Sequence, residues 1–277
     1  MSRIAVVGGG AIGGILAQAA CLAGHEVTLC VRTPFSRLVV GDDEVPARIV
    51  ASPSAAGPAD WVIVATKAYD GAAEWLSALG DVPVVVVRNG VDHAVESGAV
   101  PALAYISAKR VAPGHVVHRA GDLLVLPSGP VGSSFASLFA DGPVRVSLSD
   151  DFLTDAWRKL LTNVAANPIT ALTVRPLGVL SAPGMPWLVR GLLEEAVRVG
   201  AAAGARLSEA DVSATLDFYA RFGPDDVTSM LEDRTAGRPT EHEAITGAVV
   251  RAADEHGVEV PLNRAVLTLL DAVGVPD

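Results

Sequence analysis

The chain has few cysteines, few aromatic residues and no cluster of basic residues. Its 277 residues include 2 Cys and 5% aromatics, and the formal net charge is −10. Broad binding to nucleic acid or to anionic membranes needs a positive surface field, so this composition argues against both functions. Cys21 and Cys30 have no CxxC spacing and no histidine at metal-ligand spacing. We therefore expect buried thiols in a reducing compartment.

Charged residues are also missing from Ile4 to Gly24, and such a run superficially resembles a signal peptide or a membrane span. Five glycines between Gly8 and Gly14 make a single helix through this run costly. We therefore predict a buried strand, a tight turn and a buried helix, in a cytoplasmic protein that has no membrane partner.

The first half of the chain alternates short apolar runs with helical stretches, which is typical of an α/β protein with a parallel sheet. The expected strands are residues 3–8, 26–31, 61–66 and 82–88, and the expected helices are 11–23 and 71–79. After residue 100, Gly/Pro turns separate shorter apolar runs and predict an antiparallel extension of the sheet. These runs are residues 102–105, 115–118, 123–126 and 144–147.

From about Asp150 the apolar spacing changes to three and four residues, as in helices. The expected helices are residues 152–172, 187–203, 211–219, 240–256 and 263–273. The predicted fold is thus an N-terminal Rossmann-type doubly wound sheet over residues 1–149, followed by an all-helical C-terminal domain over residues 150–277.

A glycine motif, Gly8-x-Gly10-x-x-Gly13, follows the first expected strand and opens the first expected helix. In a dinucleotide-binding turn, the first glycine permits the tight turn and the second lets the backbone approach a pyrophosphate. The third glycine lets the helix pack closely on the strand, and the helix amino end offers N–H donors to phosphates. The alternative is a plain glycine-rich turn; the flanking strand and helix favour a cofactor site.

The second expected strand runs into Arg32, and no acidic residue follows it until Asp42. An acidic residue at this point would bind the ribose 2′-hydroxyl of NAD, whereas an arginine suits a 2′-phosphate. This pattern favours NADPH; the alternative is an ordinary surface arginine.

Polar residues follow two further expected strands, where doubly wound sheets bind ligands. Lys67 comes after the strand 61–66, and Asn89 after the strand 82–88. The alternatives are a solvated loop cation for Lys67 and a simple Asn-Gly turn for Asn89.

One expected helix carries a polar stripe on an otherwise apolar sequence. Lys159, Asn163 and Asn167 are spaced at i, i+4 and i+8, and Pro168 is expected to bend the helix beside them. Because asparagine is a poor helix former, two of them favour a lined cleft over a solvated face. The alternative is a stripe that hydrogen-bonds another helix.

Near the C-terminus, Thr240 and Glu243 have the spacing of a capping box, which leaves Glu241 free at the first helical position. The alternative role of Glu241 is to complement the helix dipole. Ser229 to Asp233 fall in a stretch expected to be irregular. The histidines show neither metal nor catalytic-triad spacing, so no metal is expected.

Together these segments resemble the ketopantoate reductase (2-dehydropantoate 2-reductase) family over essentially the whole chain. The segments that carry the resemblance are Gly8-x-Gly10-x-x-Gly13, Val31-Arg32, Thr66-Lys67-Ala68-Tyr69, Asn89-Gly90-Val91, Trp157-Arg158-Lys159-Leu160-Leu161-x-Asn163-x-x-x-Asn167-Pro168, Ser229-Met230-Leu231-x-Asp233 and Gly237-Arg238-Pro239-Thr240-Glu241. The resemblance implies NADPH-dependent reduction of a 2-oxo acid ketone, most simply ketopantoate, in pantothenate biosynthesis.

The resemblance also implies a role for each site residue. Lys159 would be the general acid that protonates the carbonyl oxygen, and Glu241 would bind the substrate hydroxyl and orient Lys159. Three further residues would hold polar groups of the substrate: Asn163, Asn167 and Ser229. Lys67 and Asn89 would lie between the nicotinamide ribose and the substrate. The implied cofactor residues are Gly8, Gly10, Ala11, Ile12, Gly13, Arg32, Lys67 and Asn89.

Two departures from the family leave alternatives open. Arg88 stands where the family often has Gln or His. Near Tyr105–Ala108, where some members have a histidine or another polar residue, this chain offers only Ser107. One alternative is a related two-domain dehydrogenase for another hydroxyacid, which would not require the Glu241 and Ser229 segments. The other is a non-catalytic NADP-binding sensor, which would be expected to lack Lys159 or Glu241. The small residues of Val197–Ala203 suit either a homodimer contact or the core.

Overall fold

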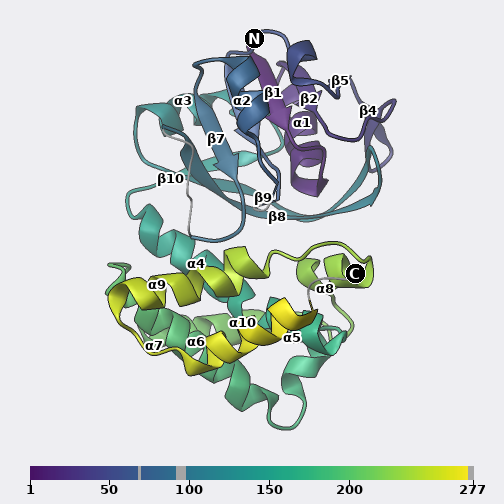
Figure 1. Cartoon of the computed structure of the whole chain (residues 1–277). Helices are drawn as coiled ribbons and strands as arrows, with labels where there is room; N and C mark the ends of the chain where they lie inside the picture. The colour runs from purple at the N-terminus through teal and green to yellow at the C-terminus, as the bar shows by residue number, and fades with distance from the viewer. Residues whose placement is uncertain (68–69, 92–97, 274–277) are drawn as a thin grey trace. The chain divides into compact units, whose positions relative to one another are not determined.

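The computed structural model describes residues 1–67, 70–91 and 98–273, and it forms two compact units. The first comprises residues 1–88 and 93–152, and the second comprises residues 89–92 and 153–277. The first is built around a twisted sheet and the second is helical (Figure 1). Each unit has its own hydrophobic core.

A mixed sheet forms the centre of the first unit, and its strands follow one another in the order β4-β3-β9-β8-β7-β6-β1-β2-β5, with β10 added beside β9. The strand bounds are β1 Arg3–Val7, β2 Glu26–Cys30, β3 Leu38–Val40, β4 Asp43–Val45, β5 Arg48–Val50, β6 Trp61–Val64, β7 Val84–Val87, β8 Val100–Ala112, β9 His115–Pro127 and β10 Arg145–Ser149. Because β1, β2, β6 and β7 are parallel, their carboxyl ends share one edge.

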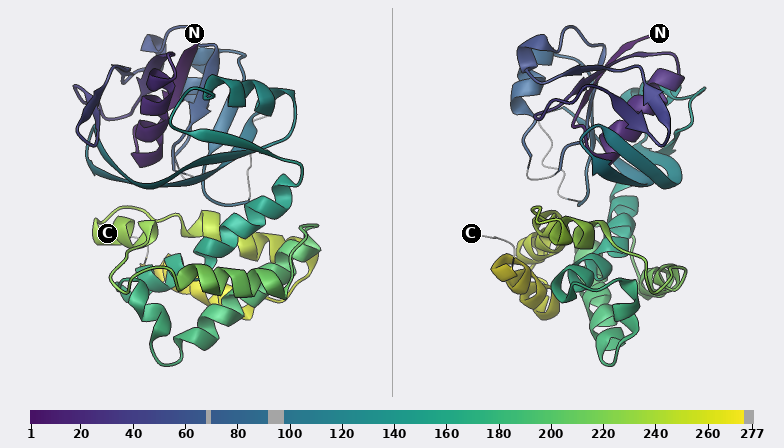
Figure 2. Two further views of the ribbon diagram at one scale, coloured as in Figure 1. Left: turned by 180° about the vertical axis from the view of Figure 1, so that it is seen from behind. Right: turned by 90° about the vertical axis from the view of Figure 1, so that its right-hand side faces the viewer.

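Both faces of the central strands are buried, as a doubly wound sheet requires. In β1, Ile4 and Val6 belong to the cluster that includes helix α1 (Ala11–Leu22) and helix α3 (Pro130–Leu138). The alternate residues Ala5 and Val7 belong to the cluster that includes helix α2 (Ala73–Leu79). Figure 2 shows these helices covering the sheet from different sides. The predicted Rossmann-type fold is confirmed.

The antiparallel extension is confirmed for β8 and β9, whose strands are longer than expected, but it is wrong for the run 144–147. β8 and β9 pair antiparallel as two strands of 13 residues each, because the short apolar runs mark only their core-facing parts. β10 pairs with β9 in parallel. Sequence periodicity missed β3, β4 and β5, since strands of three residues are too short to show it.

Apart from residues 89–91, the second unit is built from helices joined by loops. Its elements are α4 Phe152–Val164, α5 Ala166–Thr173, η2 Leu177–Ser181, α6 Met185–Ala202, α7 Glu209–Tyr219, α8 Ser229–Thr235, the π-helical turn η3 Glu243–Gly247, α9 Ala248–His256 and α10 Pro261–Val273. Helix α6 packs against α7, α9 and α10, and the buried side chains of Leu192, Leu193 and Ala196 place it at the centre of the core.

A buried carboxylate fixes the start of α10. Glu195 on α6 is 4% exposed and accepts hydrogen bonds from the backbone N–H of Leu262 at 3.0 Å and of Asn263 at 2.9 Å. The Asn263 side-chain amide donates a third bond at 2.8 Å. These donors belong to the first turn of a helix, where N–H groups have no partner within the helix and where negative charge is stabilised.

Three expectations for the helical unit were wrong. The single helix expected over residues 152–172 is divided at Ala165, because Pro168 has no N–H and its ring excludes a regular turn before it. The stretch expected to be irregular, Ser229–Asp233, lies in α8 and buries Met230 and Leu231. The helix expected from Thr240 begins later, at His242, and passes through η3.

Candidate active site

The glycine-rich turn of the first unit has the geometry that its sequence implies. Gly8 has φ +113°, and a Cβ added there would lie 2.8 Å from the backbone carbonyl carbon of Ala65. A Cβ on Gly13 would overlap the carbonyl oxygen of Gly8, whereas one on Gly10 would meet nothing within 4 Å. The first and third glycines therefore serve the packing of the turn, and the second leaves open space beside the backbone.

This turn leads directly into the amino end of α1. Gly10 is the N-cap residue and Ala11 and Ile12 begin the helix, whose first turn contains no acidic residue. The first N–H groups of a helix point along its axis and carry a partial positive charge. With no side chain at the N-cap, this end is suited to bind a phosphate group.

Polar side chains gather at the same edge of the sheet. Arg32 follows β2, and its guanidinium contacts the Asp70 carboxylate, with Nη1 2.8 Å from Oδ1. Arg88 follows β7 and donates from Nη2 to the Thr66 hydroxyl at 2.8 Å. The backbone oxygen of Lys67 accepts the Asp70 N–H at 2.9 Å. The predicted residues Arg32 and Lys67 are thus joined through Asp70, which no motif in the sequence indicates.

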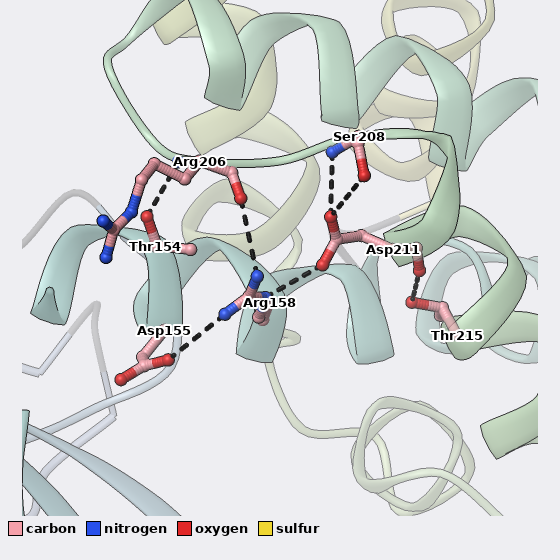
Figure 3. Close-up of polar contacts among 7 residues, drawn as sticks. All are labelled: Thr154, Asp155, Arg158, Arg206, Ser208, Asp211 and Thr215. Carbon is pink, nitrogen blue, oxygen red and sulfur yellow. Dashed lines mark hydrogen bonds and ion pairs between the residues drawn. The ribbon is translucent and has the colours of Figure 1, made fainter.

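In the second unit, α4 is anchored on the side of Arg158. Its guanidinium contacts Asp211 of α7, with Nε 2.9 Å from Oδ1, and Thr154 accepts the N–H of Arg206 at 2.8 Å. Asp211 also closes the capping box of α7 by accepting the N–H of Ser208 at 2.8 Å (Figure 3). These contacts, together with the burial of Trp157, fix the rotation of α4 about its axis and hence the direction of its neighbouring residues.

Lys159 and Asn163 are both partly buried and lie one turn apart on α4. Desolvation by burial lowers the pKa of Lys159 below its usual 10.5, because it disfavours the charged ammonium. A lysine whose pKa is lowered toward the working pH is a better proton donor than an exposed one. The expected pair Lys159 and Asn163 is therefore present on one helix.

Asn167 belongs to the next helix, contrary to the predicted continuous stripe. It is 5% exposed in the first turn of α5. Helix α5 is joined to the start of α8 by a hydroxyl pair, with Thr170 Oγ1 2.7 Å from Thr228 Oγ1. Thr228 also caps α8 by accepting the N–H of Leu231, and the exposed Ser229 follows it. Asn167 and Ser229 are thus carried by two adjoining helices.

Glu241 is 6% exposed, and its carboxylate accepts a hydrogen bond from the side-chain amide of Asn89 at 3.0 Å. Residues 89–92 belong to the second unit although β7 and β8 flank them. Gly90 has φ +101°, and a Cβ there would lie 2.5 Å from the carbonyl oxygen of Ala244. The close approach of this segment to η3 therefore requires glycine, and it brings Asn89 to Glu241.

The predicted capping box at Thr240 is wrong. The Thr240 hydroxyl lies 2.7 Å from His242 Nδ1, and Glu243 pairs with Arg251, with Oε2 2.8 Å from Nη1. Because η3 widens the first turn, Glu243 points to the helix surface rather than back to the N-cap. Instead, the backbone oxygen of Glu241 accepts hydrogen bonds from the N–H groups of Ala244 and Ile245 at the start of the helix.

Two other groups of potentially reactive side chains are a histidine–carboxylate cluster and the two cysteines. His242, Glu243 and Asp271 place possible metal-ligand atoms within 4.8 Å of one another, but His242 Nε2 is already 3.1 Å from Asp271 Oδ1. Burial raises the pKa of the Cys30 thiol to about 12, which makes it unreactive. Cys21 and Cys30 are both free thiols.

Within the described residues, no helix is long and apolar enough to cross a membrane.

Comparison with known proteins places this arrangement in a family. The model described as "Ketopantoate reductase PanE/ApbA" matches residues 4–131, and the model of its C-terminal part matches residues 151–274. The chain belongs to the ketopantoate reductase family. It is therefore an oxidoreductase, and the predicted resemblance is confirmed.

Full-length relatives agree with this assignment. The chain is 39% identical over 291 residues to the 2-dehydropantoate 2-reductase of Caulobacter vibrioides, covering 99% of this chain and 100% of that protein. It is 36% identical to the 2-dehydropantoate 2-reductase of Mycobacterium tuberculosis, with 97% of each covered. A solved dimeric ketopantoate reductase of Staphylococcus aureus has a TM-score of 0.89 at 25% identity and 98% coverage of both chains.

Proposed function

We propose that this chain reduces 2-dehydropantoate to pantoate with NADPH, as a step of pantothenate biosynthesis. The observation that carries this proposal is Lys159, a lysine with a lowered pKa on the anchored helix α4 of a ketopantoate reductase family member. Among the full-length relatives, the names of the Caulobacter vibrioides and Mycobacterium tuberculosis proteins support the choice of substrate.

The residues of the first unit fit NADPH. The open backbone at Gly10 and the amino end of α1 suit a pyrophosphate, with Gly8, Ala11, Ile12 and Gly13 shaping the turn. The exposed guanidinium of Arg32 suits a 2′-phosphate. Lys67 and Asn89 complete the residues that we assign to the cofactor, and we assign residues 1–149 as the NADP-binding domain. When bound, the dihydronicotinamide supplies a hydride to the carbonyl carbon.

The second unit supplies the proton and the contacts with the substrate. Lys159 donates a proton to the carbonyl oxygen as that oxygen gains negative charge, and its positive charge stabilises the developing alkoxide. Hydride and proton together convert the ketone to the secondary alcohol, which balances the reaction. Lys159 is then neutral and takes a proton from solvent before the next turnover.

Glu241 has a buried carboxylate that Asn89 holds in place, so it can accept a hydrogen bond from the substrate hydroxyl without moving. Three further side chains of the proposed substrate-binding domain, residues 150–277, bind polar groups of the substrate, chiefly its carboxylate: Asn163, Asn167 and Ser229. Their amide and hydroxyl groups donate hydrogen bonds without adding charge.

The test follows NADPH absorbance with 2-dehydropantoate and a panel of other 2-oxo acids, in wild type and in Lys159→Ala. We expect turnover to be highest with 2-dehydropantoate and to fall about 10²- to 10⁴-fold in the variant, as for loss of a general acid. Lys109→Ala, in β8 of the other unit, is the matched control. Full activity in Lys159→Ala would remove its assigned role, and turnover of only other 2-oxo acids would reassign the substrate.

We place the enzyme in the cytoplasm, because both cysteines are free thiols and disulfides are rare in reducing compartments. A homodimer is the proposed assembly, supported by the dimeric relative from Staphylococcus aureus. Cell fractionation and analytical ultracentrifugation test these two statements separately.

A further inference from the structure

Arg32 and Asp70 form a two-pronged ion pair within the first unit. Arg32 Nη1 is 2.8 Å from Asp70 Oδ1, and Arg32 Nη2 is 3.1 Å from Asp70 Oδ2. This fork-to-fork geometry is the one in which a guanidinium also binds a phosphate. The carboxylate of Asp70 therefore occupies the donors that we assign to the 2′-phosphate of NADPH.

The two partners differ in how firmly they are held. The Arg32 side chain is 75% exposed, whereas that of Asp70 is 19% exposed. The backbone of Asp70 is tied by its N–H to Lys67 O at 2.9 Å, and its oxygen accepts from Thr66 Oγ1 at 3.0 Å and from Arg88 Nη2 at 3.3 Å. Asp70 is thus a fixed negative charge, and Arg32 is the partner that is free to move.

We propose that Asp70 sets the cofactor preference of this site by competing with the 2′-phosphate of NADPH for Arg32. This inference rests on the proposed function, in which Arg32 binds that phosphate. Binding of NADPH then requires Arg32 either to release Asp70 or to contact the carboxylate and the phosphate together. In the second case, two negative charges lie close to one guanidinium. NADH carries no 2′-phosphate and does not meet this competition. Asp70 therefore lowers the ratio of the affinity for NADPH to the affinity for NADH.

The expected effect is modest because the pair lies at the surface. Exposed ion pairs are weak, and repulsion across water between a carboxylate and a phosphate a few ångströms away is similarly small. We expect Asp70→Asn to tighten NADPH binding about three- to tenfold and to change NADH binding by less than about twofold. The asparagine keeps the shape of the side chain and its backbone contacts.

The experiment measures dissociation constants of the full chain for NADPH and NADH from nicotinamide fluorescence. Measurement at low salt and about pH 8 keeps a phosphate monoester fully ionised and unscreened. Asp70→Asn, Arg32→Ala and the double variant form a cycle, and we expect the gain from Asp70→Asn to vanish in the Arg32→Ala background. Added salt should also reduce the gain.

Asp60→Asn is the matched control. Asp60 directly precedes β6 and pairs at 2.6 Å with Arg3, the first residue of β1, so the same change of charge occurs at the opposite edge of the sheet. Both dissociation constants should stay unchanged in this variant. An equal gain in Asp60→Asn would show a general charge effect and overturn the proposal.

Two further results separate this inference from the proposed function. If Arg32→Ala weakens NADPH selectively but Asp70→Asn does not tighten it, the cofactor site stands and the role of Asp70 is wrong. Weaker NADPH binding in Asp70→Asn would mean that Asp70 orders Arg32 for the cofactor. If Arg32→Ala weakens the binding of both cofactors equally, Arg32 does not bind the 2′-phosphate. The assignment of Arg32 to this phosphate and the competition by Asp70 then both fail.

Discussion

The two units of this chain build their candidate sites by opposite means. In the first unit, the turn around Gly8, Gly10 and Gly13 is made by backbone, and its geometry depends on side chains being absent. In the second unit, the candidate residues Lys159, Asn167, Ser229 and Glu241 come from separate elements, and their geometry depends on the side chains that hold them. One site is a local motif and the other is a product of packing.

This difference determines how each site should respond to substitution. A backbone site fails through steric overlap, so even one methyl group is sufficient to block it. A side-chain site fails through lost hydrogen bonds and misplaced charges, and its members are coupled to one another. Substitutions in each site should therefore separate these two modes of failure.

Among the substitutions that contrast the two sites, a methyl group in the turn is expected to have the largest effect. In Gly13→Ala the new Cβ would overlap the oxygen of Gly8, so the turn and α1 must separate. We expect NADPH affinity to fall at least about a hundredfold, and the free energy of unfolding to fall by about 1–3 kcal/mol, as for other overpacked positions. Nicotinamide fluorescence and thermal unfolding measure the two effects.

Gly10→Ala is the comparison variant, because its Cβ would have no neighbour within 4 Å. Stability should be unchanged within about 0.5 kcal/mol, as for surface substitutions, while NADPH binding weakens. A variant that binds NADPH as tightly as wild type would show that the cofactor does not approach Gly10.

The second effect concerns coupling in the helical unit. Asn89→Ala removes the donor to the buried Glu241 carboxylate, and Glu241→Ala removes the acceptor. We expect each to lower kcat/KM about 10- to 100-fold, since a hydrogen bond to a charged group contributes about 1.5–3 kcal/mol. The double variant should lose much less than the sum, because the two residues act as one unit. Additive losses would mean that Asn89 acts on the cofactor alone.

The same contrast explains what could be predicted from the sequence. The turn at Gly8 to Gly13 and the position of Arg32 after β2 follow from local spacing, which survives into the folded chain. The pairing of Asn89 with Glu241 joins residues 152 positions apart, and no local pattern records it. Asp70 lies beyond the end of β6 on the edge where ligands bind, so the strand-end rule could have drawn attention to it.

The errors in the helical unit arise where local signals conflict with packing. A stripe at i, i+4 and i+8 predicted one helix, but Pro168 divides it and moves Asn167 onto α5. The spacing of Thr240 and Glu243 matches a capping box, yet η3 inserts a wider turn there. The true capping box, at Ser208 and Asp211, does not match the usual sequence pattern because its N3 residue is Asp and not Glu or Gln.

The third effect is on the pH dependence of the reaction. Lys159 must be protonated to donate, and its pKa lies below 10.5, so the rate of reduction should fall as pH rises through that lowered pKa, by about tenfold per pH unit. Lys159→Arg stays charged throughout, so its residual activity should show no such decline. If the decline in rate persists in Lys159→Arg, the titration of a group other than Lys159 causes it.

The stability of the helical unit should follow the opposite trend. Between the lowered pKa and 10.5, the unfolded chain keeps a proton on Lys159 that the folded chain has lost. Unfolding therefore takes up a proton, and the free energy of unfolding rises with pH across this window. Lys159→Met should remove this contribution, which a series of thermal melts at increasing pH would detect.

The smallest effect tests whether a side chain at a left-handed backbone position lowers stability in the helical unit, as a side chain at Gly13 is expected to do in the turn. Val174, at the end of α5, has φ 52° and ψ 41°, a left-handed conformation that a β-branched residue adopts only with strain. Since Val174 is 52% exposed, little packing would be lost on replacement. Val174→Gly should raise the free energy of unfolding by about 1 kcal/mol.

The reverse change is Gly257→Val at the end of α9, where φ is +65° and an added Cβ meets nothing within 4 Å. This variant should lower the free energy of unfolding by a similar amount. If both variants melt like wild type, helix ends in this unit tolerate left-handed valine, and backbone conformation matters only in the turn.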